Sequence, residues 1–104
     1  MFGSIKKLLG LGAKTDLSQI IASGAQIVDV RTPGEYSSGH LKSSINIPLD
    51  VLSFRSGKLK KDQPVVTCCA SGMRSRTAKN ILVSAGFNYV YNGGRWHNLR
   101  KYEK

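Results

Sequence analysis

The sequence predicts an α/β domain built on a largely parallel sheet of four to five strands, with helices on both faces. Short apolar runs rich in β-branched residues alternate along the chain with stretches whose apolar residues have helical spacing. The 104 residues have the size of one compact domain, and with 40% hydrophobic and 21% charged residues wholesale disorder is not expected. We expect this domain to occupy residues 14–104, after an N-terminal extension over residues 1–13.

Helix and strand signals alternate through the first half of the chain. Asp16 can cap a helix that contains three apolar residues at helical spacing and ends at Gly24. Pro33 suits the first turn of a short helix that ends near Gly39. The apolar runs at residues 27–30 and 44–47 predict two strands.

The second half repeats the alternation. Asp50 can cap a short helix that runs through Phe54. Residues 65–68 and 89–91 predict two further strands, and residues 69–73 between them form a loop rich in small residues. That loop leads into a helix over residues 74–85, which Gly86 closes. A last short helix holds Trp96 and Leu99.

The two cysteines of the chain, Cys68 and Cys69, are adjacent. Neighbouring residues of a strand point to opposite faces, so a disulfide between them would need a strained backbone. They therefore cannot serve as an ordinary crosslink, and a reducing compartment, the cytoplasm, is expected. No apolar run is long enough to span a bilayer, and the apolar stretch near the N-terminus is too short for a secretory signal.

The charge balance favours an anionic partner. Sixteen Lys and Arg residues face six Asp and Glu residues, which gives a formal net charge of +10. A field of that sign attracts anions and speeds their arrival. Composition alone does not decide whether the anion is a small substrate, a nucleic acid or a membrane surface.

The segment from Cys69 to Ser75 carries the strongest signal for chemistry. Cys69 follows a predicted strand, and ligands of parallel α/β folds bind outside the carboxyl ends of the strands. A free thiol has a pKa of about 8.5, yet the thiolate is the reactive form. Loop amides, the positive end of the next helix and the cation of Arg74 would favour that thiolate. An inert buried cysteine explains the neighbouring Gly, Arg and Ser less well.

The other residues of this loop have expected roles as well. Gly72 lets the backbone turn where a side chain would clash. Ser75 can bond to the thiolate or cap the helix. The small residues Ala70 and Ser71 keep open the bowl that the loop forms around the sulfur. We expect Cys69 to be the catalytic nucleophile. The expected substrate-binding residues are Ala70, Ser71, Gly72, Met73, Arg74 and Ser75.

Three motifs, in order, resemble the rhodanese family. Residues 69–75, Cys-Ala-Ser-Gly-Met-Arg-Ser, are similar to its Cys-x-x-Gly-x-Arg-Ser active loop. Residues 29–48 contain Asp-Val-Arg, Glu-Tyr, Gly-His-Leu and Asn-Ile-Pro, which resemble the family's Asp-Val-Arg, Glu-Tyr, Gly-His-Ile and Asn-Ile-Pro. Residues 86–96 resemble its closing motif. The resemblance covers residues 15–100 and implies a rhodanese-like single domain.

The resemblance also implies the activity of a thiosulfate sulfurtransferase. In this family the thiolate attacks the outer sulfur of thiosulfate, sulfite leaves, and a persulfide remains for a thiol or cyanide to accept. No metal or organic cofactor is implied. The expected partners are a small anionic sulfur donor, a thiol or cyanide acceptor, and a possible protein donor or acceptor. We expect no nucleic-acid partner and no membrane span.

Two alternatives stay open at this point. Counted from Cys68, the segment fits the Cys-x5-Arg loop of tyrosine phosphatases and arsenate reductases, although Ser71 then takes the position of the glycine. A sulfur-relay module that binds a protein partner would have the same fold and loop.

Several polar residues outside the loop match family positions. We expect Arg31, Glu35 and His40 to form a polar framework, because buried polar groups are usually hydrogen-bonded. Trp96 is expected to pack the last helix, and His97 to lie on the surface.

Overall fold

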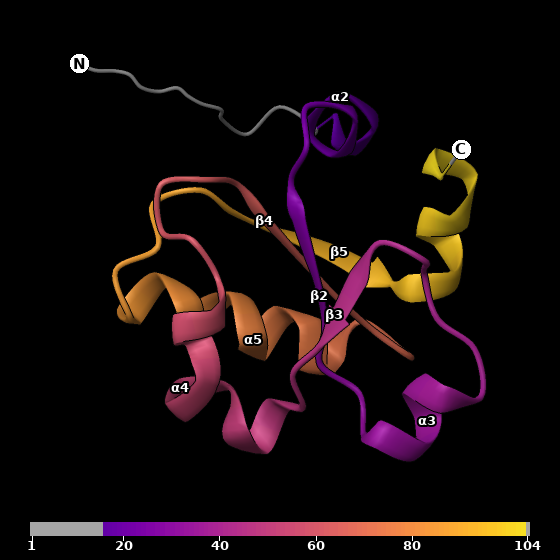
Figure 1. Cartoon of the computed structure of the whole chain (residues 1–104), viewed down its shortest axis with the longest axis horizontal. Coiled ribbons are helices and arrows are strands. Elements are labelled where there is room, and N and C mark those ends of the chain that lie inside the picture. The colour runs from indigo at the N-terminus through magenta and orange to yellow at the C-terminus, as the bar shows by residue number, and fades with distance from the viewer. Residues whose placement is uncertain (1–15, 104) are drawn as a thin grey trace.

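The computed structural model describes residues 16–103, and all strands of its four-stranded sheet are parallel (Figure 1). The strands are β2 (Gln26–Asp29), β3 (Ser44–Asn46), β4 (Val65–Cys69) and β5 (Val90–Arg95). Their order in the sheet is β3-β2-β4-β5. The predicted fold class is therefore confirmed. The expected N-terminal extension, residues 1–13, lies outside the described residues.

Helices cover both faces of the sheet (Figure 1). They are α2 (Leu17–Ala22), α3 (Pro33–Ser37), η1 (Leu49–Val51), α4 (Leu52–Arg55), η2 (Ser56–Lys58), α5 (Met73–Ser84) and η3 (Trp96–Tyr102). Apolar side chains of η1, α4 and α5 pack on one face, and those of α2 and η3 pack on the other. Among the helices of residues 16–103, none is both long and apolar enough to cross a membrane.

Strand β4 is buried along its whole length. Val65 and Cys69 belong to the core cluster that includes α5, whereas Val66 and Cys68 belong to the cluster that includes η3. This division follows from the alternation of side chains along a strand. The two adjacent cysteines therefore point to opposite faces of the sheet, as predicted, and both are free thiols.

Local sequence determines the caps of α2 and α3 but not the start of α4. Asp16 accepts hydrogen bonds from backbone N–H groups in the first turn of α2. Thr32 caps α3 in a capping box with Glu35, and Pro33 occupies the first helical position. The cap expected at Asp50 is wrong. This residue lies inside η1, and neither η1 nor α4 has a side-chain cap.

The carboxyl ends of β4 and β5 differ from the prediction. Cys69 is the last residue of β4 rather than the first loop residue, and α5 begins at Met73. Strand β5 extends to Arg95 because pairing resumes beyond an irregularity and joins Cys69 to Arg95. At Gly93 an added Cβ would lie 2.6 Å from the carbonyl oxygen of Thr67, so only glycine fits there.

Candidate active site

The sulfur of Cys69 lies at the N-terminus of α5. Its Sγ accepts hydrogen bonds from the backbone N–H of Gly72 at 2.9 Å and of Ser75 at 3.2 Å. Gly72 is the N-cap of this 12-residue helix and has φ +98°, a conformation that favours glycine. Two N–H donors and the positive end of the helix dipole therefore face one sulfur, an arrangement that stabilises a thiolate.

The rest of the loop does not form the open bowl expected from the sequence. Cys69 is fully buried, because its sulfur turns inward to the two amides and its side chain packs into the core cluster under α5. Ala70 is half-buried and Ser71 is exposed, while Met73 is 77% exposed. Among the described residues, none of these three donates a hydrogen bond to the sulfur. They form the outer rim of the loop.

The hydroxyl of Ser75 does not reach the sulfur. It donates to Oδ1 of Asn92 at 2.6 Å and lies 2.8 Å from Oγ1 of Thr67. Oγ1 of Thr67 also donates to the carbonyl oxygen of Ser75 at 2.9 Å. The expectation that Ser75 bonds to the sulfur is therefore met by its backbone N–H, and its side chain does not cap the helix.

Arg74 forms an ion pair with Glu35 of α3. Its two terminal nitrogens donate to the two carboxylate oxygens at 2.7 and 2.9 Å, in bidentate geometry. These hydrogen bonds, with that from the backbone of Thr32, lower the pKa of Glu35 to about 2. Arg74 thus supplies a cation near the loop, but a carboxylate from a distant element already binds its guanidinium.

This ion pair predicts a pH-dependent contribution to stability. A carboxyl group whose pKa is depressed stabilises the fold above its unfolded pKa, and the contribution is lost as the pH falls through the folded value. At neutral pH, Glu35→Gln is expected to lower the free energy of unfolding by about 1 kcal/mol, a small loss because the pair is partly exposed. The cost should shrink as the pH falls from about 4.5 to about 2.

Urea unfolding of wild type and Glu35→Gln across this pH range measures the effect. Asp62→Asn is the matched control, because Asp62 is exposed and has no ion pair with a described residue. A difference between wild type and Glu35→Gln that stayed constant with pH would contradict the assignment.

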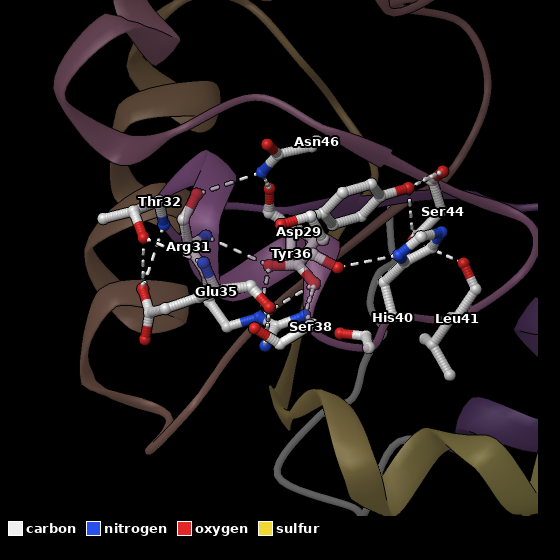
Figure 2. A network of polar contacts seen from close by, with 12 residues as sticks. Asp29, Arg31, Thr32, Glu35, Tyr36, Ser38, His40, Leu41, Ser44 and Asn46 are labelled. Atoms are coloured by element: carbon white, nitrogen blue, oxygen red, sulfur yellow. Dashed lines mark hydrogen bonds and ion pairs between the residues drawn. The ribbon is translucent and has the colours of Figure 1, made fainter.

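The polar framework expected from the sequence is centred on Asp29 and Arg31 (Figure 2). Arg31 donates from Nε and Nη2 to the carboxylate of Asp29 at 2.8–3.0 Å, and both residues are buried. It also donates to the backbone carbonyls of Glu35 and Gly39 and lies 4.6 Å from the Trp96 ring. Arg31 is therefore a structural cation, with its donors already engaged.

The other residues of this segment extend the framework without reaching Cys69. His40 is exposed, stacks on Tyr36 at 3.8 Å and has Nδ1 2.8 Å from that residue's carbonyl oxygen (Figure 2). Trp96 packs in the core cluster of η3, and His97 is exposed, as predicted. Glu35 is the one predicted framework residue that also contacts the loop of Cys69.

A groove of about 630 Å³ opens beside Arg74. It is lined by residues that follow β2, by the end of β3, by η1, by Arg55 of α4 and by Arg74, and most of its surface is apolar. Arg55 and Asp50 add one charge of each sign to its lining. Pockets for small organic molecules have volumes of roughly 300–1,000 Å³, so the groove exceeds what a small inorganic anion requires.

Cys68 lies away from all of these groups. Its side chain is buried on the opposite face of the sheet from Cys69, beside the carboxylate of Asp29 in the neighbouring strand. Burial raises the pKa of the Cys68 thiol far above its ordinary value, and the charge of Asp29 adds to that effect. The phosphatase register would need this thiol in the loop, where the structure does not place it.

Sequence reasoning missed Thr67 and Asn92 as partners of the loop, and Arg55 as part of the groove. A signal was present for the first two, because each stands near the carboxyl end of a predicted strand. No local pattern marks Arg55, which joins the site only through folding. Among residues 16–103, no group of three His, Cys, Asp or Glu side chains could hold a metal ion.

Comparison with known proteins shows which family this chain resembles. The family model "Rhodanese-like domain" matches residues 13–96. The thiosulfate sulfurtransferase GlpE of Shewanella oneidensis is 34% identical over 80 residues, which are 73% of this chain and 79% of the relative. The uncharacterized protein YqhL of Bacillus subtilis is 37% identical over 84 residues, or 77% of this chain and 67% of that protein.

Solved structures agree with the sequence relatives. A rhodanese with anions from E. coli matches with a TM-score of 0.68 and 32% identity, covering 72% of this chain and 91% of that one. The human single-domain sulfurtransferase TSTD1 matches with a TM-score of 0.70 and 26% identity, covering 86% and 93%. These relatives support a sulfurtransferase role. The chain belongs to the rhodanese-like domain family.

Proposed function

We propose that the protein transfers sulfane sulfur from thiosulfate to a thiol or cyanide through a persulfide on Cys69. The observation that carries this proposal is the pair of N–H donors from Gly72 and Ser75 on the Cys69 sulfur at the N-terminus of α5. A thiolate, and the persulfide anion formed from it, both gain from such donors. The net charge of +10 supports an anionic donor.

The proposed reaction has two displacement steps. The Cys69 thiolate attacks the outer sulfur of thiosulfate, a sulfur–sulfur bond forms, and the bond to the sulfonate sulfur breaks. Sulfite leaves with the electron pair, and the cysteine carries a persulfide anion. A thiolate acceptor or cyanide then attacks the terminal sulfur, and Cys69 leaves as the thiolate.

The loop residues have distinct proposed roles in these steps. The backbone N–H groups of Gly72 and Ser75 hold the sulfur, while Ala70, Ser71 and Met73 form the rim over which the donor enters. Arg74 meets the sulfonate, and for this it must share or exchange its bonds to Glu35. Because the sulfur of Cys69 is buried, the donor reaches it only when the rim moves.

Mass spectrometry of the intact protein after incubation with thiosulfate tests the proposal. We expect one added sulfur atom, located on Cys69 by fragmentation and removed by cyanide with release of thiocyanate. A protein of unchanged mass, with released sulfite at background, would contradict the proposal.

A second candidate, a sulfur relay between proteins, is favoured by exposed apolar residues beside the site. Phe54 is 84% exposed on α4, one residue before Arg55 of the groove, and Met73 is 77% exposed at the first position of α5. Large exposed apolar side chains are typical anchors of protein interfaces. In this case Cys69 would receive sulfur from a protein persulfide, and thiosulfate would be incidental.

The relay candidate is tested with two donors on the same variants. If it holds, Phe54→Ser slows sulfur transfer from a persulfide on an acidic test protein but leaves the rate with thiosulfate unchanged. Met73→Ser slows transfer from the protein donor more than transfer from thiosulfate, because Met73 also belongs to the rim that thiosulfate crosses. Val83→Ser is the control, because Val83 is 52% exposed on α5, near the end of the helix opposite Met73. Equal rates for all three variants with both donors would exclude the relay surface.

A further inference from the structure

A chain of three polar side chains lies beneath the loop of Cys69. Thr67 comes from β4, Ser75 from α5 and Asn92 from β5. The distances are 2.8 Å between the two hydroxyl oxygens and 2.6 Å from Oγ of Ser75 to Oδ1 of Asn92. Thr67 and Ser75 are fully buried and Asn92 is exposed, and among the described residues no buried side-chain polar atom lacks a hydrogen-bond partner. At its buried end, where Thr67 meets Ser75, such a satisfied network is rigid.

The direction of each proton in the chain follows from hydrogen-bonding chemistry. The atom of Asn92 that faces Ser75 also accepts the backbone N–H of Gly94 at 2.9 Å, so it is the amide oxygen. An amide oxygen only accepts, so Ser75 must give it its single hydroxyl proton. Because the proton of Ser75 goes to Asn92, the single hydroxyl proton of Thr67 lies between the carbonyl oxygen of Ser75 at 2.9 Å and its hydroxyl oxygen at 2.8 Å and is shared by them. The chain therefore runs from Thr67 through Ser75 to Asn92.

This chain fixes the backbone of Ser75, whose N–H donates to the sulfur of Cys69 at 3.2 Å. It also fixes the turn after Asn92, because the same amide oxygen binds the N–H of Gly94. The Cα of Gly94 lies 3.8 Å from the position of a Cβ on Gly72, so this turn is a neighbour of the residue that supplies the second N–H donor. Asn92 thus binds the hydroxyl of the residue that supplies one donor and orders a turn beside the residue that supplies the other.

We infer that Thr67 and Asn92 are positioning residues for the Cys69 sulfur. They touch neither the sulfur nor the groove, and they act through the backbone N–H groups of Ser75 and Gly72. The expected effect of the two residues on kcat rests on the proposed function. Their expected effect on the alkylation of the Cys69 thiol does not.

The experiment uses a Cys68→Ala background, so that Cys69 is the only thiol. Alkylation by iodoacetamide is followed against pH, since the thiolate is the reacting species. We expect Thr67→Val and Asn92→Ala to move the midpoint of this profile to higher pH and to lower kcat about three- to tenfold, the effect of weakening one hydrogen bond to a charged group. KM for thiosulfate should change little.

Matched variants separate positioning from general destabilisation. Thr67→Ser keeps the hydroxyl and should restore the wild-type profile. Asn88→Ala removes a neighbouring exposed amide and should leave the profile unchanged. The two residues act through one chain of hydrogen bonds. The double variant Thr67→Val with Asn92→Ala should therefore raise the activation free energy by less than the sum of the increases in the two single variants.

Two results would overturn the inference. One is an unchanged alkylation profile in folded Asn92→Ala or Thr67→Val, even if the melting temperature falls. The other is full additivity in the double variant. Failure of the proposed function would look different, because wild type would then show no persulfide with thiosulfate while the alkylation profiles could still shift. If Asn92→Ala does not fold, the comparison of Thr67→Ser with Thr67→Val decides the question.

Discussion

Replacement of Cys69 by serine is expected to reduce thiosulfate:cyanide transfer to background, whereas Cys68→Ala should keep most of the activity. A serine hydroxyl at position 69 can accept hydrogen bonds from the same N–H groups but cannot form a persulfide. Cys68 points into the core on the opposite face of the sheet, where burial raises its thiol pKa. Thiocyanate release by purified variants of equal concentration measures the effect.

The control for this pair is retention of the fold, checked by circular dichroism and melting temperature. Cys68→Ala removes one buried sulfur from the core, so its stability should fall by about 1 kcal/mol while its rate is maintained. Equal loss of activity in both folded variants would show that the position of Cys69, three residues before Gly72, does not identify the nucleophile. Turnover of an aryl phosphate that depends on Cys68 would favour the phosphatase alternative instead.

The parts of the site that the sequence reveals are local. The spacing from Cys69 to Gly72 and Ser75 sets which amides can reach the sulfur, since all three lie in the short segment 69–75, where β4 passes into α5. The same applies to the sheet, because runs rich in β-branched residues, such as residues 65–68, favour a strand whatever surrounds them in the fold. The fold class, and the loop amides that face the Cys69 sulfur, could therefore be predicted.

The parts that the sequence hides are contacts between distant residues. Arg74 and Glu35 are 39 positions apart, so a cation read as available to the thiol is in fact paired. The burial of Cys69 depends on how the whole core closes around β4, and no local spacing reports it. The hydroxyl of Ser75 turns to Asn92, 17 positions away, and not to the sulfur. Local patterns specify which groups are present, and tertiary structure specifies which partner each group binds.

The largest loss of stability is expected for Asp29→Ala, in the framework that holds α3 to the sheet. Arg31 is 5% exposed and donates to the carboxylate of Asp29 from its backbone N–H, Nε and Nη2. The substitution leaves a buried guanidinium without its counterion, which typically costs about 3–5 kcal/mol. Domains of this kind have a total stability of about 5–15 kcal/mol, so the variant should be largely unfolded in mild denaturant.

Urea unfolding at neutral pH measures this loss, with Asp50→Ala as the control because Asp50 is exposed and has no ion pair among residues 16–103. Asp29→Asn should fall between wild type and Asp29→Ala, since an amide oxygen can still accept from Arg31 but carries no charge. Arg31 also donates to the carbonyl of Glu35, whose carboxylate binds Arg74. If Asp29→Ala were no less stable than Asp50→Ala, the buried pair would not be what holds α3 in place.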